Sequence, residues 1–207
     1  MKPVILCGGG GHARVLLEAL RASSRTVLGV CSPEPGSLLD EVPWLGDDDW
    51  LRQHGPAGVE LVNGVGSVGD LRLRVAIFDR FKSVGFSFAS VMHPSAIVAS
   101  GVTLGEGVQL MAGVIVQPGS VLGDNVVLNT RVSIDHDCAL GAHVHLAPGV
   151  VFSGHVTVGA RTHVGPGAVA IQGVTIGADC LIGAGALVLK PLPDGVTAYG
   201  VPARRVS

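Results

Sequence analysis

The chain has 207 residues, with 14 Lys and Arg against 16 Asp and Glu, and its formal net charge is −2. This balance argues against a protein that binds nucleic acid through a basic surface. No apolar run approaches the roughly 18 residues that a membrane-spanning helix needs. Glycine accounts for 31 residues and aromatic residues for only 4%, so small aliphatic side chains must build the core.

The four cysteines, Cys7, Cys31, Cys138 and Cys180, are widely spaced and form no CxxC pair. Such spacing is typical of reduced thiols in a cytosolic protein. The apolar run at the N-terminus is too short for the central region of a secretory signal. We therefore expect a cytoplasmic protein that binds neither membrane nor nucleic acid.

The first 90 residues alternate short apolar runs with amphipathic ones. We expect strands at 3–7, 26–30 and 59–62, and helices at 13–22, 47–54 and 71–81. This alternation predicts a small, parallel, Rossmann-like α/β domain over residues 1–90, which we expect to bind a nucleotide sugar. Residues 87–94 are expected to join it to the rest of the chain.

A glycine-rich segment, from Gly8 to His12, lies between the first expected strand and helix. The spacing Gly8-x-Gly10-x-x-Ala13 matches a dinucleotide-binding fingerprint, in which glycines let a diphosphate approach the N–H groups of a helix N-terminus. NAD binding also requires an acidic residue about 20 positions further on, but Cys31-Ser32-Pro33 stands there. We therefore favour a nucleotide-sugar diphosphate, with NAD or a tight turn without ligand as alternatives.

Residues 96–191 repeat every six residues without a break, which makes 16 hexads. The third position is apolar in all 16, and glycine holds the fourth position in 7 and the sixth in 8. Positions one and three lie on the same side of a short strand, so they form a core, and Cys138 and Cys180 are expected to be buried in it. Three such strands close a coil of 18 residues, and the stack predicts about five coils.

A polar segment, Asn129 to Asp137 (NTRVSIDHD), lies within the repeat. His136 occupies the fifth position of its hexad, at a corner that faces outward. An imidazole has a pKa that suits general-base catalysis near neutral pH, and Asp137 is placed to orient the ring. The alternative is a solvent-exposed corner histidine without a catalytic role.

These motifs run nearly from end to end of the chain. They are GGGGHARV at 8–15, GVGS at 64–67 with Arg74 beyond it, HPSA at 93–96, NTRVSIDHD at 129–137, HLAPG at 145–149 and YGVPAR at 199–204. With them, the chain resembles the sialic acid O-acetyltransferase family of hexapeptide-repeat acyltransferases, and especially its members that N-acetylate nucleotide-linked amino sugars. The resemblance implies a left-handed parallel β-helix over residues 91–207, and acetyl-CoA as co-substrate.

The resemblance also implies roles for individual residues. His136 matches the catalytic base and Asp137 its acidic support, while His145 matches a histidine that contacts acetyl-CoA. The segments that bind the sugar nucleotide in the family match Gly10, Gly11, His12 and Gly66. We further expect Pro166 and Ala184 to contact acetyl-CoA, and Asn129 to contact the sugar nucleotide. Cys31 and Ser32 cannot supply the carboxylate that some members place against the nucleotide, so uridine and guanosine diphosphate both stay open.

The 18-residue coil makes two geometric predictions. Gly154 follows His136 by one full coil, so its N–H group is placed to stabilise an oxyanion beside the base. His145 follows His136 by half a coil, so the two face different sides of one prism and meet only across a subunit interface. The resemblance implies that this interface belongs to a homotrimer.

Three functions are compatible with these patterns. The favoured one is an N-acetyltransferase of a UDP- or GDP-linked 4-amino sugar that transfers acetyl directly, because no Ser or Cys stands beside His136 as a nucleophile. An O-acetyltransferase of a sialic-acid-like sugar is the second. A zinc-dependent hydratase, or a purely structural β-solenoid, is the third. We expect no metal, because His143, His145, His155 and His163 do not form a convergent triad of ligands in the hexad pattern.

Overall fold

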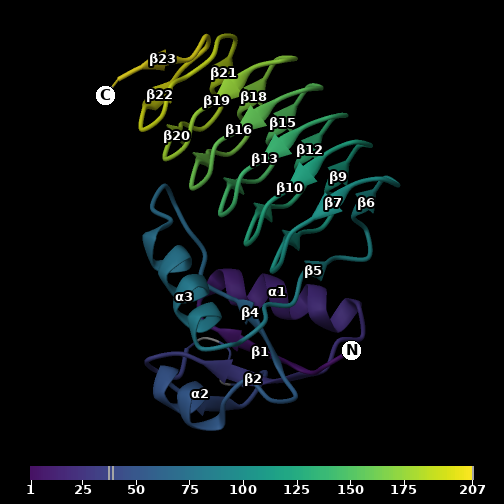
Figure 1. The fold of residues 1–207 in the computed structure, drawn as a ribbon, viewed down its shortest axis with the longest axis vertical. Helices are drawn as coiled ribbons and strands as arrows, with labels where there is room; N and C mark the ends of the chain where they lie inside the picture. The colour runs from purple at the N-terminus through teal and green to yellow at the C-terminus, as the bar shows by residue number, and fades with distance from the viewer. Residues whose placement is uncertain (37, 39, 207) are drawn as a thin grey trace.

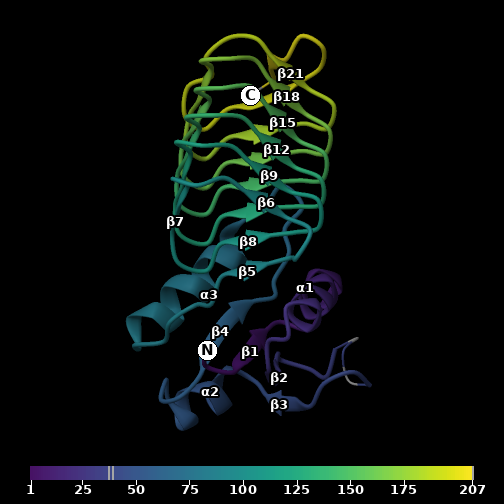
Figure 2. The same cartoon turned by 90° about the vertical axis from the view of Figure 1, so that its right-hand side faces the viewer.

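The structure is a computed structural model that describes residues 1–36, 38 and 40–206. It contains an N-terminal α/β part and a long stack of coils that rises from it (Figure 1). The stack is the left-handed parallel β-helix that the resemblance implied, and the α/β part lies at its lower end. Figure 2 shows the coils from the side, with strands of successive coils directly above one another.

The N-terminal part has four parallel strands in the order β3-β2-β1-β4. They are β1 (Val4–Cys7), β2 (Val27–Cys31), β3 (Trp44–Gly46) and β4 (Glu60–Asn63), and the helices are α1 (Gly11–Ala22), α2 (Asp48–His54) and α3 (Arg72–Ser83). The predicted strands and helices are all confirmed. Only the short edge strand β3 was not expected.

Alternation along β1 explains how the helices are placed. Val4 and Leu6 lie in one apolar cluster with the buried side of α1. Ile5 and Cys7 point to the opposite face, where they share a second cluster with residues of α2 and α3. Successive side chains of a strand face opposite sides of a sheet, so an apolar strand such as β1 requires a helix on each side.

The β-helix consists of two-residue strands that form three parallel sheets. The β12 sheet contains β6 (Ile97–Val98), β9 (Ile115–Val116), β12 (Ser133–Ile134), β15 (Val151–Phe152), β18 (Val169–Ala170) and β21 (Leu187–Val188). The β13 sheet contains β7 (Thr103–Leu104), β10 (Val121–Leu122), β13 (Ala139–Leu140), β16 (Thr157–Val158) and β19 (Thr175–Ile176). The β14 sheet contains β5 (Val91–Met92), β8 (Gln109–Leu110), β11 (Val127–Leu128), β14 (His145–Leu146), β17 (His163–Val164), β20 (Leu181–Ile182), β22 (Thr197–Tyr199) and β23 (Arg204–Arg205).

The register of these strands is one coil of 18 residues, as the hexads predicted. Ser133 pairs with Val151 in the β12 sheet, and His145 pairs with His163 in the β14 sheet. The third hexad position lies inside the prism and forms a continuous apolar core. The sixth position lies at the corners and adopts a left-handed conformation, even where it is not glycine, as at Asp137 with a φ of 58°.

The two ends of the stack differ from the simple repeat. β5 pairs with β8, so the β14 sheet begins one hexad earlier than predicted and the segment 87–94 is more than a connector. At the other end, β23 pairs antiparallel with β22. At the lower end, buried residues of α1 share a cluster with Ala89, Val91 and Met111, which joins the α/β part to the first coils.

The four cysteines and the lengths of the helices can be compared with the expectations from the sequence. All four cysteines are buried free thiols, and burial raises the pKa of the Cys138 thiol. No helix in the described part of the chain is both long and apolar enough to cross a membrane.

Candidate active site

A cavity of about 570 Å³ opens where the strand ends of the α/β part meet the β14 sheet. We name it the glycine pocket, and it is lined by Gly8, Gly9, Gly10, Gly11, His12, Val15, Ser32, Pro33, Gly64, Val65, Gly66, Ser67, Val68, Asn129 and His145. It thus brings together every residue that was predicted to bind the sugar nucleotide. Ligands of open parallel sheets bind at this carboxyl edge of the strands.

The glycines of the pocket fall into two groups. Gly8 has a φ of +101°, and a Cβ on Gly64 would lie 2.8 Å from the carbonyl oxygen of Gly8, so the fold itself requires glycine at both positions. In contrast, a Cβ on Gly10 or Gly11 would meet nothing within 4 Å. Neither the backbone nor intrachain packing explains glycine there, which favours a ligand that approaches the start of α1 over a tight turn without ligand.

The backbone of the pocket offers several free donors. Gly10 is the N-cap of α1 and has no side chain that could accept a capping hydrogen bond. The first N–H groups of the helix are therefore not bonded to a cap. The N–H groups of Gly66 and Ser67 likewise donate to no acceptor among the described residues. A helix N-terminus with open N–H groups attracts anions.

The end of β2 carries no carboxylate, as the sequence indicated. Ser32 is buried at the pocket wall, and its hydroxyl donates a 2.6 Å hydrogen bond to the carbonyl oxygen of Glu34. An acidic partner for a ribose is therefore absent from the pocket lining that the structure describes. This is the feature that a typical NAD site has and this pocket lacks.

Two histidines, the half-buried His12 and the buried His145, line the pocket. His12 bonds through Nε2 to Gln109 Oε1 at 2.8 Å, and burial lowers the pKa of His12 to about 4. His145 Nδ1 lies 2.5 Å from the hydroxyl of Ser67, while its Nε2 is buried without a partner among the described residues. Burial also lowers the pKa of His145 well below its ordinary value, so both imidazoles are neutral near pH 7.

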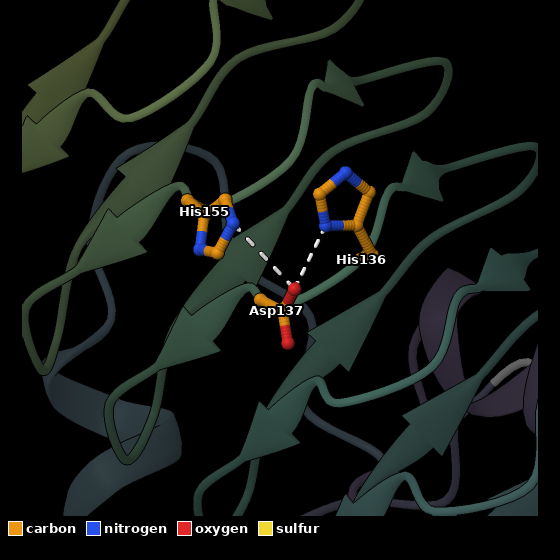
Figure 3. Close-up of side chains that lie close together, drawn as sticks. All are labelled: His136, Asp137 and His155. Carbon is orange, nitrogen blue, oxygen red and sulfur yellow. Dashed lines mark hydrogen bonds and ion pairs between the residues drawn. The ribbon is translucent and has the colours of Figure 1, made fainter.

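His136 lies at a different corner of the prism, in the turn between β12 and β13. Its Nδ1 is 2.8 Å from the Oδ2 of Asp137 (Figure 3). A carboxylate only accepts, so Nδ1 donates and Nε2 is left as the free acceptor. The hydrogen bond to Asp137 raises the pKa of His136 above its ordinary value.

Gly154 lies directly above His136, as the 18-residue coil predicted. The N–H of His155 donates to the carbonyl oxygen of His136 at 2.9 Å, which stacks the two coils at this corner. A Cβ on Gly154 would come within 2.6 Å of His136 Nε2. The N–H of Gly154 itself has no acceptor among residues 1–36, 38 and 40–206, so it is available beside the free Nε2 of His136.

The structure contains a cluster at this corner that the sequence did not predict. His136, Asp137 and His155 form a cluster whose ligand atoms all lie within 4.8 Å of one another. His155 Nε2 is 3.6 Å from the same Asp137 oxygen that bonds His136 (Figure 3). The sequence prediction concerned His143, His145, His155 and His163 as ligands and did not include this cluster, which forms because Asp137 and His155 are one coil apart. All three side chains are exposed, and their geometry is explained by the hydrogen bond between His136 and Asp137.

In one chain, His136 and the glycine pocket do not meet. Asn129 lies in the turn that precedes β12, at the corner with the β14 sheet, whereas His136 lies in the turn that follows β12. The outer side of the β12 sheet separates them. This is the relation predicted for His136 and His145, which face different sides of the prism.

The residues expected to contact acetyl-CoA divide between two places. Pro166 and Ala184 are exposed on the corner column above Asn129, where coil stacks on coil through hydrogen bonds from Gly149 to Thr130, Gly167 to Pro148 and Gly185 to Pro166. His145 is instead buried in the glycine pocket at the foot of this column. Its contact with acetyl-CoA stays a prediction.

Comparisons with known proteins identify the repeat and its relatives. The family described as bacterial transferase hexapeptide (six repeats) matches residues 155–190, and the hexapeptide repeat of succinyl-transferase matches residues 95–118. A UDP-N-acetylbacillosamine N-acetyltransferase of Bacillus subtilis (strain 168) is 35% identical over 118 residues, which are 54% of this chain and 52% of that relative. The match thus spans about half the length of that curated relative.

Solved structures match the whole chain. PerB from Caulobacter crescentus, in complex with CoA and GDP-perosamine, is 44% identical with a TM-score of 0.91 and covers 100% of this chain and 98% of that chain. The acetyltransferase domain of PglB from Neisseria gonorrhoeae FA1090, in complex with acetyl coenzyme A, is 32% identical with a TM-score of 0.92 over 99% of both chains. The chain therefore belongs to the hexapeptide-repeat transferase family, in the group of nucleotide-amino-sugar N-acetyltransferases that its motifs indicated.

Proposed function

We propose that the protein is an acetyl-CoA-dependent N-acetyltransferase that acts on a nucleoside-diphosphate-linked 4-amino sugar. The observation that carries this proposal is the division of the site. A pocket with open N–H donors lies at one corner of the β12 sheet and an imidazole with a free Nε2 lies at the other. The names of the relatives, which act on bacillosamine and perosamine nucleotides, support the same substrate class.

The N-terminal part, residues 1–90, holds the sugar nucleotide in this proposal. Its diphosphate lies against the start of α1 and the loop 64–67, where open N–H groups and the helix dipole favour an anion. The absence of side chains at Gly10 and Gly11 lets the phosphates approach the backbone. Asn129 then contacts the sugar from the β-helix side of the pocket.

The β-helix, residues 91–207, binds acetyl-CoA along the corner column that contains Pro166 and Ala184. This column fits an elongated ligand because its exposed side chains from Pro148 to Ala184 are small or are proline. The larger side chains of Arg131 and Tyr199 lie at its lower and upper ends. It leads down to Asn129 and His145 at the pocket. Acetyl-CoA supplies the activated acetyl group as a thioester.

His136 is the general base. Asp137 holds its Nδ1 proton, so Nε2 accepts the proton that the sugar amine loses when it attacks the acetyl group. The N–H of Gly154 lies beside Nε2 and stabilises the negative charge that develops on the acetyl oxygen. Transfer is direct because, in the described residues, no Ser or Cys side chain bonds to His136. The C–N bond forms, the C–S bond of the thioester breaks, and CoA leaves as a thiol with the proton that His136 had accepted.

The complete site forms between subunits of a homotrimer. The outward column of the β12 sheet is apolar except for Ser133, with Ile97 and Val151 exposed and Ile115, Val169 and Leu187 half-buried. Such a surface is typical of a subunit interface. Packing it against a neighbour brings the pocket corner of one subunit toward the His136 corner of the next.

A panel of nucleotide sugars tests this function. Purified protein is incubated with acetyl-CoA and with UDP- or GDP-linked 4-amino sugars, and free CoA thiol is measured. We expect turnover with a 4-amino sugar and an amide in the product, together with a loss of roughly 10² to 10⁴ in kcat for His136→Ala. Turnover only with a hydroxyl acceptor would support the O-acetyltransferase instead. Hydratase activity lost on chelation would support a zinc enzyme at His136, Asp137 and His155.

A further inference from the structure

Arg74 is buried directly behind the loop that lines the glycine pocket. Its side chain is 1% exposed and lies on α3. Nη1 donates hydrogen bonds to the carbonyl oxygens of Asn63 (3.0 Å) and Val65 (2.9 Å), and Nη2 donates to Asn125 Oδ1 at 2.9 Å. Val65 also lines the glycine pocket. The guanidinium group is therefore bonded to the backbone of a residue in the pocket wall.

The charge of Arg74 has no counter-ion among the residues that the structure describes. All its acceptors are neutral oxygens, and its Nε has no partner in the part of the chain that the structure describes. Burial lowers the pKa of Arg74 to about 9, which still leaves it positive at neutral pH. A buried cation without an anionic partner is unfavourable, so its presence needs an explanation beyond bonding the loop.

The pocket in front of Arg74 lacks charged side chains. None of its described lining residues is Lys, Arg, Asp or Glu. Its two histidines are neutral, and the nearby charge of Arg74 is one of the causes that lower the pKa of both His12 and His145. The positive potential of Arg74 therefore reaches the pocket, and within one chain it is the buried charge closest to its wall.

We propose that Arg74 sets the affinity for the diphosphate of the sugar nucleotide without touching it. The negative ligand is the counter-ion that the buried guanidinium lacks. By drawing the carbonyl groups of Asn63 and Val65 inward, Arg74 also leaves the N–H groups of Gly66 and Ser67 free for the ligand. The proposal rests on the proposed function, and it assigns to Arg74 the selection of diphosphate-bearing sugars over uncharged ones.

Asn125 allows the charge to be neutralised while Arg74 is kept. Asn125→Asp places a carboxylate at the oxygen that Nη2 already contacts. Asn125 has a φ of 56°, and Asp137 and Asp179 occupy equivalent corners with φ values of 58° and 55°, so aspartate fits this backbone. Arg74→Met removes the charge with a side chain of similar length, and Arg74→Lys retains it.

Calorimetry tests this by measuring the affinity for two series of ligands. One series is guanosine, GMP and GDP, and the other is uridine, UMP and UDP. Acetyl-CoA is measured as a separate ligand. For Asn125→Asp and Arg74→Met we expect affinity to fall on the order of tenfold for each negative charge of the nucleotide. The nucleoside and acetyl-CoA should bind as to the wild type, and Arg74→Lys should retain diphosphate binding. Thr157→Glu, which adds a charge on the exposed β13 sheet, is the matched control.

A second readout is the protonation of His12, followed by NMR in the absence of ligand. When Asn125→Asp neutralises the charge of Arg74, the pKa of His12 should rise toward its ordinary value, because that charge is one cause of its lowering. Asn and Asp are of the same size, so this exchange leaves the burial of His12, which is the largest cause, in place. Equal loss of nucleoside and diphosphate binding, or unchanged diphosphate binding in Asn125→Asp, would overturn the proposal. If the wild type binds neither diphosphate, the proposed function fails with it; if the wild type binds and the variants bind equally, only the role of Arg74 fails. Should Arg74→Met not fold, Asn125→Asp alone decides.

Discussion

The imidazole of His136 occupies the space that a side chain on Gly154 would need. A Cβ built on Gly154 lies 2.6 Å from both Cε1 and Nε2 of His136, well inside van der Waals contact. The ring of the base is therefore seated on the backbone of the next coil, with Asp137 at its other side. The imidazole, the carboxylate and the free N–H thus come from two turns that are stacked one coil of 18 residues apart.

Gly154→Ala tests whether this seat is needed. The added methyl group must push the ring of His136 away from its position, and a displacement of about 1 Å is expected to lower kcat roughly 10- to 100-fold. Steady-state kinetics measures the loss, and thermal unfolding checks that the coil is intact. Gln172→Ala, one coil higher on the same corner, is the control and should be nearly neutral. Normal turnover in Gly154→Ala would contradict the assignment of His136 as base in this orientation.

Asp137→Asn tests the cause of the raised pKa of His136. A base must be unprotonated, so kcat/KM should fall as the pH drops through the pKa of His136. Because the hydrogen bond to Asp137 raises this pKa, the wild-type acid limb should lie above the ordinary value of about 6.5. In Asp137→Asn the limb should move to lower pH, and the plateau should fall about tenfold as orientation is lost.

Asp135→Asn is the matched control for that profile. Asp135 accepts the N–H of His136 rather than its ring, and it raises the pKa of His136 less than Asp137 does. Its replacement should shift the acid limb by a smaller amount. Equal profiles for the wild type and Asp137→Asn would show that another group titrates in the rate-determining step.

Gly11→Val tests the role of the glycine pocket. A side chain at this position meets nothing within 4 Å in the chain, so the fold should tolerate it. It should obstruct the path of the diphosphate to the start of α1 and raise the Kd for the nucleotide by tenfold or more, on the order of two lost charge-assisted hydrogen bonds. Calorimetry should find acetyl-CoA binding unchanged. Loss of both ligands, or of neither, would contradict the division of labour between the two parts of the chain.

Mixed trimers test the shared site. His136→Ala removes the base and His145→Ala alters the pocket, and both proteins should be inactive by themselves. After subunit exchange, some sites pair an intact pocket with an intact base from a neighbour. For random trimers of equal parts, activity should return to about one quarter of the wild-type level. If mass spectrometry finds mixed trimers and no activity returns, the two histidines do not serve one site across the interface.

The hexad period predicted the fold of the β-helix and much of its active corner. It placed Gly154 over His136 and the third-position side chains in the core. The same period also places Asp137 next to His155. This contact was not predicted, because the metal hypothesis considered only histidines and not acidic residues one coil of 18 residues away. The early strand β5 was missed for a similar reason, since Val91 and Met92 hold the second and third positions of one more hexad.

The depth of His145 could not be predicted from the repeat. Second-position side chains point out of the prism on all three sheets, and the repeat does not distinguish among them. The α/β part covers only the β14 sheet, so Gln109, His145 and His163 become buried while Val121 and Val151 stay exposed. Whether His145 is buried therefore depends on how the two parts dock. Contacts between them, such as the bond from Arg74 to Asn125, join residues far apart in the chain.

The lower coils of the stack have one further consequence for solubility. A β-helix ends in unpaired strand edges that invite other copies to add coils, as in a growing fibre. Here α1 and the loop before β5 lie over the lower end through Ala89, Val91 and Met111, and the antiparallel pair of β22 and β23 closes the upper end of the β14 sheet. The α/β part thus also covers the lower edge of the β14 sheet, and its removal is expected to expose an edge that promotes aggregation.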